Sequence, residues 1–147
     1  MFKRIFFSAM VAALLAPQAE ASAQVVVIVN EGNPASSLSQ DDVRAYFMKA
    51  EPRWRNGEKV RPIDQTGSSA ERGTFISTVL GISDAEFERY WIEKQYASAE
   101  QPPVRAPNPG AVITLVKSFE GGIGFVSQAV WEAADQTGVK VVYTVDG

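Results

Sequence analysis

Residues 24–30, QVVVIVN, decide the fold class of this chain. A short β-branched run of this kind, ended by Glu-Gly-Asn-Pro, is typical of a buried strand. A second such run, VKVVYTV, occupies residues 139–145 and predicts the final strand. Helical patterns alternate with shorter strand candidates between the two runs. This interleaving predicts an α/β domain with a mixed sheet flanked by helices.

The intervening elements can be placed from cap residues and periodicity. We first expect a helix after an N-cap at Ser39, with Val43, Tyr46 and Phe47 on one face, and then a strand over 59–64 with Pro62 at a sheet edge or strand end. A second helix should follow a capping box of Ser68 and Glu71, bury Phe75, Thr78 and Val79 and stop at Gly81, and an aromatic helix should follow a capping box of Ser83 and Glu86. The remaining elements are a loop over 98–109, a helix over 110–119, a glycine turn and strand over 121–126, and one or two helical turns over 128–134. The aromatic side chains at 87, 90, 91 and 96 are spaced as a core stripe, and a partner groove is the less favoured interpretation.

The first 23 residues have the pattern of a secretory signal. Lys3 and Arg4 precede an apolar run over 5–16, and small residues follow Pro17. The run is shorter than the roughly 20 residues that span a bilayer. We therefore predict a signal peptide over 1–23, cleaved after Ala23 or after Ala21, and a single domain over 24–147. This domain would reside in the periplasm or outside the cell, with no membrane span.

Composition excludes several kinds of chemistry. The chain has 14 Lys and Arg against 17 Asp and Glu, and no Cys or His. Removing Lys3, Arg4 and Glu20 with the signal leaves 12 against 16, a charge of −4, which argues against a nucleic-acid partner. Disulfides, thiol nucleophiles, imidazole bases and Cys/His zinc sites are all excluded. Binding is therefore expected rather than catalysis, with no cofactor or metal. An enzyme would need a carboxylate pair such as Asp64 with Glu71.

Four segments, in order, resemble a known family. They are IVNEGNP (28–34), LSQDDVRAYFMKAEPRWRNGEKVRPID (38–64), DQTGSSAERGTF (64–75) and GGIGFV (121–126). Together they look like one lobe of the periplasmic phosphate-binding proteins of ABC importers. The resemblance implies a single lobe similar to one domain of a type 2 periplasmic binding protein. The chain is too short for the family's two lobes, and the phosphate loop of the first lobe is absent.

The resemblance also implies a ligand loop. Asp64, Thr66, Gly67 and Ser68 fit the family's Asp-x-Ser-Gly-Thr pattern, and by the resemblance Asp64 would accept a proton from a protonated phosphate. Gln65 replaces the usual glycine, and Pro62 stands where the family has its phosphate-binding arginine. Arg61 and Arg72 are the nearby substitutes.

From the residues alone, Thr66, Gly67, Ser68 and Ser69 offer hydroxyls and unpaired N–H groups at a helix start, where anions bind well, and Arg72 offers a bidentate contact. The structural alternative is that Ser68 only caps its helix, Arg72 is a solvated charge and Asp64 ends a strand. Two functions remain open. One is an exported module that weakly binds phosphate or a similar small oxyanion. The other is a lobe without a ligand that docks another envelope protein.

Overall fold

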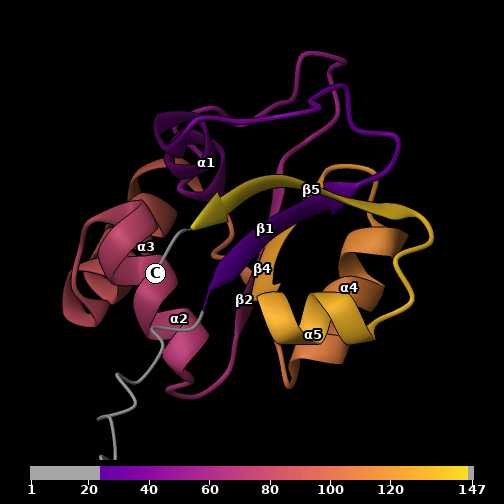
Figure 1. Cartoon of the computed structure of the whole chain (residues 1–147). Coiled ribbons are helices and arrows are strands. Elements are labelled where there is room, and N and C mark those ends of the chain that lie inside the picture. Colours follow the sequence, from indigo (N-terminus) through magenta and orange to yellow (C-terminus); the bar gives the residue numbers. More distant parts are fainter. Residues whose placement is uncertain (1–23, 146–147) are drawn as a thin grey trace, which may run out of the picture.

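The computed structural model describes residues 24–145, so the predicted signal at 1–23 lies outside the described residues. Five strands form one mixed sheet in the order β3-β2-β4-β1-β5 (Figure 1). β2 is parallel to β3 and β4, whereas β1 is antiparallel to β4 and β5. The strands are β1 (Val25–Asn30), β2 (Arg61–Gln65), β3 (Val104–Ala106), β4 (Gly122–Ser127) and β5 (Val139–Val145). The expected α/β fold is confirmed.

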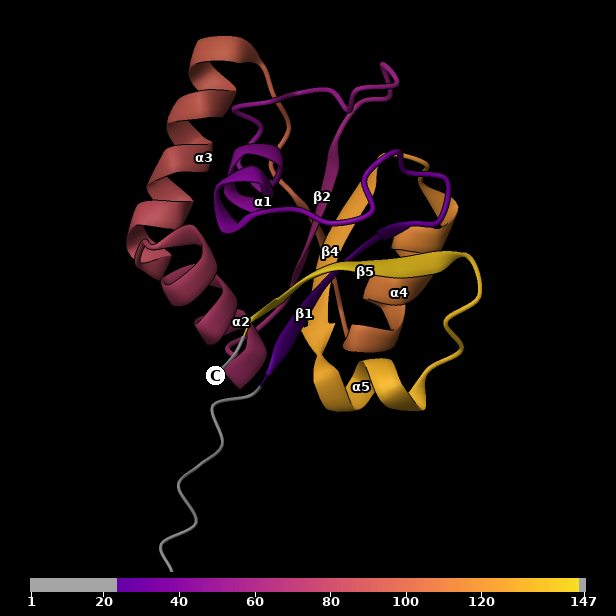
Figure 2. The same cartoon turned by 45° about the horizontal axis from the view of Figure 1, so that its top comes forward.

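Helices cover both faces of this sheet. One side carries α1 (Gln40–Phe47), α2 (Ala70–Thr74) with its π-helical continuation η1 (Phe75–Leu80), and α3 (Asp84–Ser98), and the other carries α4 (Pro109–Ser118) and α5 (Gln128–Ala133) (Figures 1 and 2). β1 lies between the two layers. Val25, Val27 and Val29 pack into the core with the first group of helices. Val26 and Ile28 pack into a second core under α4 and α5. The β-branched run is therefore buried on both faces, because successive side chains of a strand point to opposite sides.

The start of α1 follows the prediction. Ser39 caps the helix by accepting from the Asp42 N–H, and the Asp42 side chain accepts from the Ser39 N–H in return. Val43 and Phe47 are buried and Tyr46 is half-buried, so the apolar face turns toward the sheet as expected.

The next helix departs from the prediction at its start and in its buried face. Ser69, not Ser68, is the N-cap, and its hydroxyl accepts from the Arg72 N–H. Thr78 is exposed, and Ile76 and Leu80 are buried beside Phe75 and Val79. The π-helical winding of η1 explains the change, since i→i+5 bonding widens the turn and rotates the face that an α-helical spacing assumes. The segment stops at Gly81 as predicted, in the left-handed conformation with φ of 68°.

Other predictions were wrong in part. In α3, Phe87 and Trp91 are buried and Tyr90 is half-buried, but Tyr96 is 90% exposed and contributes nothing to the core. The expected loop over 98–109 contains the short strand β3. Consequently β2 is not an edge strand. Pro62 is tolerated because β3 pairs only with Ile63–Gln65, beyond the proline.

None of the helices within residues 24–145 is both long and apolar enough to cross a bilayer.

Candidate functional site

The predicted loop lies where three parallel strands end. Gln65, Ala106 and Ser127 close β2, β3 and β4 at one edge of the sheet. Helices α2, α4 and α5 start directly beyond this edge, capped by the side chains of Ser69, Asn108 and Ser127. Figure 2 shows α2 and α5 at the same end of the sheet. In open α/β sheets, ligands bind outside the carboxyl ends of the parallel strands. The predicted segment therefore occupies the edge that this fold class uses for ligands.

Asp64 is buried at this edge and is bound to Arg72. Its side chain accepts from Arg72 Nε at 2.9 Å through Oδ1 and from Arg72 Nη2 at 3.0 Å through Oδ2. Oδ1 also accepts from the Gln65 N–H at 2.7 Å. Only 1% of Asp64 and 8% of Arg72 is exposed. Bidentate pairing of this kind fixes the orientation of both groups.

Arg72 also reaches α3. Its Nη1 donates to Asp84 at 3.1 Å, and the guanidinium lies 5.6 Å from the ring centre of Phe87. Burial alone would lower the pKa of Arg72, but the hydrogen bond to Asp64 and the charges of Asp64, Asp84 and Glu88 outweigh it and raise the pKa. Arg72 is therefore a permanent cation that links β2, α2 and α3. Three of the five N–H groups of this guanidinium already donate to carboxylates, so Arg72 has only two left to offer an anion.

Gln65 holds the base of the loop. Its Nε2 donates to the Phe125 carbonyl at 3.0 Å, and its Oε1 accepts from the Ser69 hydroxyl at 3.3 Å. The Thr66 N–H donates to the Ala106 carbonyl at 2.9 Å. The residue that replaces the family's usual glycine thus ties the loop to β4 and to the cap of α2. Sequence reasoning noted Gln65 only as a departure. No local pattern in the sequence indicates this role, because both partners of Gln65 are set by how the loop folds against β4 and α2.

The tip of the loop carries the free donors. Thr66, Gly67 and Ser68 are exposed, and Gly67 has a φ of 86°. No hydrogen bond between described residues engages the N–H groups of 67–71 or the hydroxyls of Thr66 and Ser68. Such unpaired groups at a helix start are suited to an anion. The half-buried carboxylate of Glu71, in the first turn, opposes one.

The structure separates the other residues considered. Arg61 begins β2 at the opposite end of the strand from the loop and lies over the Phe119 ring at 5.0 Å, so it is not brought to the loop. Asp64 is paired with arginine rather than with a second carboxylate. Within residues 24–145, no group of three or more acidic, His or Cys side chains is arranged to hold a metal ion.

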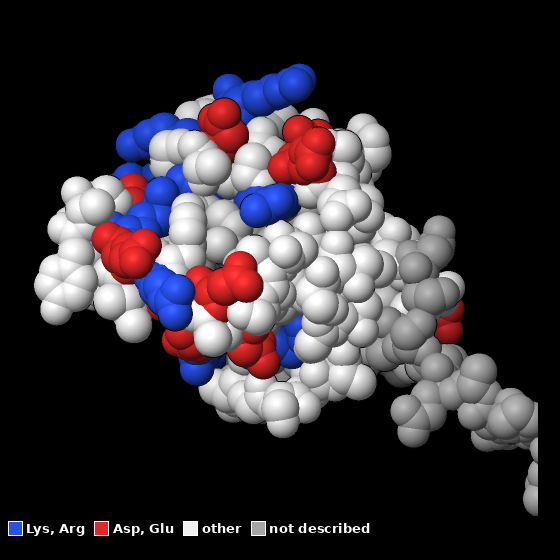
Figure 3. All heavy atoms as spheres, turned by 90° about the vertical axis from the view of Figure 1, so that its left-hand side faces the viewer, with Lys and Arg blue, Asp and Glu red and all other residues white. Residues whose placement is uncertain are grey.

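The surface over α1, α2 and α3 carries mixed charge. Figure 3, which shows this side, has Lys and Arg interspersed with Asp and Glu. A nucleic-acid partner needs clustered basic side chains. On the face shown, the charges do not form such a cluster.

The chain is similar in structure to solved phosphate transport proteins. An ABC-type phosphate transport receptor from Vibrio cholerae matches with a TM-score of 0.61 and 20% identity over 83% of this chain and 47% of that one. A putative phosphate ABC transporter substrate-binding protein with bound phosphate from Clostridium perfringens matches with a TM-score of 0.63 and 17% identity over 83% and 46%. A possible phosphate binding protein from Planctomyces limnophilus matches with a TM-score of 0.59 and 14% identity over 83% and 42%.

These likenesses establish the fold. The chain spans less than half the length of the structures it matches, which agrees with one lobe of a two-lobed binding protein. No protein-family model matches the chain, and no curated protein matches it in sequence.

Proposed function

We propose that this chain is an exported, single-lobe binding module that weakly holds phosphate or a similar small oxyanion at the loop Asp64–Ser69. Removal of residues 1–23 would leave the domain in the periplasm or outside the cell, acting as a binding protein rather than an enzyme. The observation that carries the proposal is the set of unengaged N–H and hydroxyl donors at 66–71, at the carboxyl edge of a sheet with the fold of a phosphate-binding lobe.

Within this proposal the six predicted residues have two roles. Thr66, Gly67 and Ser68 touch the anion through hydroxyls and main-chain N–H groups. Asp64, Ser69 and Arg72 position them, because the ion pair and the cap fix where the loop leaves β2 and enters α2. Arg72 makes no direct bond to the anion, because its guanidinium is already paired with Asp64 and Asp84. Binding is weak because one lobe encloses only part of the anion.

The test is thermal unfolding of the chain from Gln24 onward, with phosphate and sulfate raised to tens of millimolar at constant ionic strength. A site with a Kd of about 1 mM should raise stability by more than about 1 kcal/mol at about 10 mM ligand. The rise should disappear in Ser68→Ala and persist in Ser98→Ala, a matched serine on the far end of α3. Glu71→Gln should strengthen the response, because it removes a negative charge beside the anion. No shift with either anion in the unmodified chain would refute the proposal.

The second candidate function is docking to another envelope protein. It is favoured by three exposed apolar side chains, Ile92 and Tyr96 on α3 and Val104 on β3. Ile92 and Tyr96 are four residues apart and share one helical face. If this function holds, a protein captured from a periplasmic extract by the unmodified chain should be lost with Ile92→Lys and Tyr96→Lys combined. A monomer that captures no partner would remove this alternative.

A further inference from the structure

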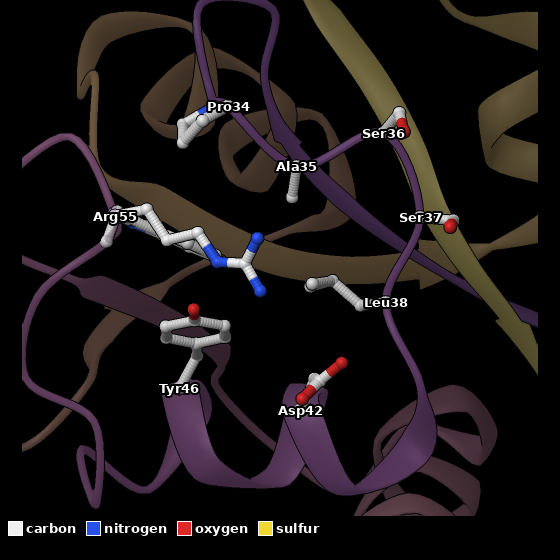
Figure 4. Close-up of a pocket in the computed structure, with 9 residues that line it drawn as sticks. Pro34, Ala35, Ser36, Ser37, Leu38, Asp42, Tyr46 and Arg55 are labelled. Atoms are coloured by element: carbon white, nitrogen blue, oxygen red, sulfur yellow. The ribbon is translucent and has the colours of Figure 1, made fainter.

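A hollow lies at the other end of the sheet from the Asp64 loop. Its volume is about 200 Å³, and it opens between the segment after β1, helix α1 and the turn before β2 (Figure 4). β1 runs antiparallel to β4 and β2 parallel to it, so the end of β1 lies with the start of β2, away from the carboxyl edge described above. We call this hollow the Arg55 pocket. Its lining includes Ala35, Leu38, Asp42, Tyr46, Trp54 and Arg55.

The walls of the Arg55 pocket are held by hydrogen bonds from outside it. The Leu38 N–H donates to the Val142 carbonyl at 2.9 Å, which fixes the crossing segment against β5. Trp54 Nε1 donates to the Gly121 carbonyl at 3.0 Å, and the Trp54 ring stacks on Tyr46 with ring centres 4.0 Å apart. The Trp54 N–H donates to the Glu58 carbonyl, closing the tight turn that carries Arg55. The hollow is thus set by the fold rather than by a loose loop.

Two opposite charges face this pocket without meeting. The guanidinium of Arg55 extends into the hollow, and Asp42 faces it from the first turn of α1 (Figure 4). Among the described residues, Arg55 has no hydrogen bond and no ion pair, so its charge is not neutralised by Asp42 at contact distance. Asp42 Oδ2 accepts a hydrogen bond from the Ser39 N–H, and the other carboxylate oxygen accepts none from the described residues. The space between them is flanked by the apolar side chains of Ala35 and Leu38 (Figure 4).

We propose that the Arg55 pocket binds a small zwitterion of the α-amino acid class. The carboxylate of the ligand pairs with Arg55, whose planar fork fits a carboxylate with two parallel bonds. The ammonium lies toward the free oxygen of Asp42, and a short apolar side chain rests on Ala35 and Leu38. A ligand with only one charge satisfies one of these groups and meets the like charge of the other. The volume restricts the ligand further, because drug-sized molecules occupy pockets of about 300 Å³ or more.

This site is independent of the oxyanion proposal. It shares no residue with the loop 64–72 and lies at the opposite end of the sheet. The two sites also differ in ligand chemistry, since the loop offers donors to an anion and the Arg55 pocket offers one group of each sign.

The experiment is isothermal titration of the chain from Gln24 onward with L-alanine, at constant ionic strength. Acetate and methylammonium serve as ligands that carry only one of the two charges. We expect alanine to bind and the two single-charge compounds to give no response at the same concentrations. Arg55→Gln and Asp42→Asn should each weaken alanine binding at least about tenfold, because each removes a charged hydrogen-bond partner. Asparagine retains an acceptor for the Ser39 N–H, and circular dichroism should show α1 intact.

Arg89→Gln, an exposed arginine on α3, is the matched control and should leave alanine binding unchanged. Equal responses to alanine and acetate, an unchanged affinity in Arg55→Gln, or no alanine binding up to tens of millimolar would each overturn the proposal. Phosphate titrations keep the two sites distinct. A phosphate response lost in Ser68→Ala and kept in Arg55→Gln belongs to the loop. One lost in Arg55→Gln and kept in Ser68→Ala would make the Arg55 pocket a simple anion site and refute the zwitterion.

Discussion

Arg72 and Arg55 lie at opposite ends of one sheet and are held in opposite ways. Arg72 is buried, and its three nitrogens donate to Asp64 and Asp84. Arg55 is exposed, reaches into a hollow and bonds to none of the described residues. An arginine near the predicted oxyanion loop is therefore not by its position alone a residue that binds a ligand. What matters is whether its donors are already engaged, and by this measure Arg72 stabilises the fold whereas Arg55 remains available.

The largest expected effect is the loss of stability when Arg72 is removed, which tests whether its ion pair holds the fold together. Arg72→Met leaves Asp64 buried without its counter-ion, and breaking a buried pair in this way costs about 3–5 kcal/mol. Arg55→Met should change the free energy of unfolding by less than about 0.5 kcal/mol, as is usual for an exposed side chain. Urea unfolding followed by circular dichroism measures both. Similar losses in the two variants would show that the two arginines are not held differently.

The double variant Arg72→Met with Asp64→Leu sharpens the same point. Replacing a whole buried pair by apolar groups is often neutral, whereas removing one partner is not. The double variant should therefore be more stable than Arg72→Met alone. If the stability lost in the double variant equals the sum of the losses in Arg72→Met and in Asp64→Leu, the ion pair is not the source of the cost.

An intermediate effect is expected at the cap beside Arg72. Ser69→Ala removes the acceptor of the Arg72 N–H and should cost about 1 kcal/mol. Ser68→Ala should cost less than about 0.5 kcal/mol, because its hydroxyl engages no described residue. The same urea experiment compares the adjacent serines. A larger loss of stability in Ser68→Ala than in Ser69→Ala would mean that Ser68 is the N-cap, as the sequence pattern predicts.

The smallest effect is expected at the outer partner of Arg72. The Asp84 side chain is 70% exposed, and an exposed ion pair contributes about 0–1 kcal/mol. Asp84→Asn should therefore lower stability slightly, and the difference should shrink in 0.5 M salt because exposed charges are screened. A loss as large as that of Arg72→Met, unaffected by salt, would mean that Asp84 rather than Asp64 is the main partner.

Much of the fold could be predicted from hydrophobic patterning. The runs at 25–30 and 139–145 are strands, and Ser39, Gly81 and Ser83 end or begin helices where local chemistry requires it. The position of the loop after β2 was also accessible, since strand, loop and helix follow one another directly. These features depend on interactions within a few residues of the chain.

The rest depends on contacts that local patterns do not encode. The strand β3 has only three residues after two prolines and exists because β2 is there to pair with it. The buried face of η1 differs from the predicted one because the segment is wound as a π-helix rather than as an α-helix. Arg72 was interpreted as a ligand residue or a solvated charge, because its bond to Asp64 depends on how α2 folds back against β2. The Arg55 pocket was missed because it exists only once the segment before α1 crosses to β5.

The order of the strands has a consequence for when this protein can fold. β1 lies between β4 and β5, so Val25 pairs with Ser127 on one side and with Val145 on the other. β1 therefore pairs only with strands that lie about a hundred residues further along the chain. Loops of this length close slowly, and contacts so distant in sequence slow folding. During synthesis, the apolar run 25–29 stays without its strand partners until almost the whole domain has been made, and an unpaired apolar strand is prone to aggregate.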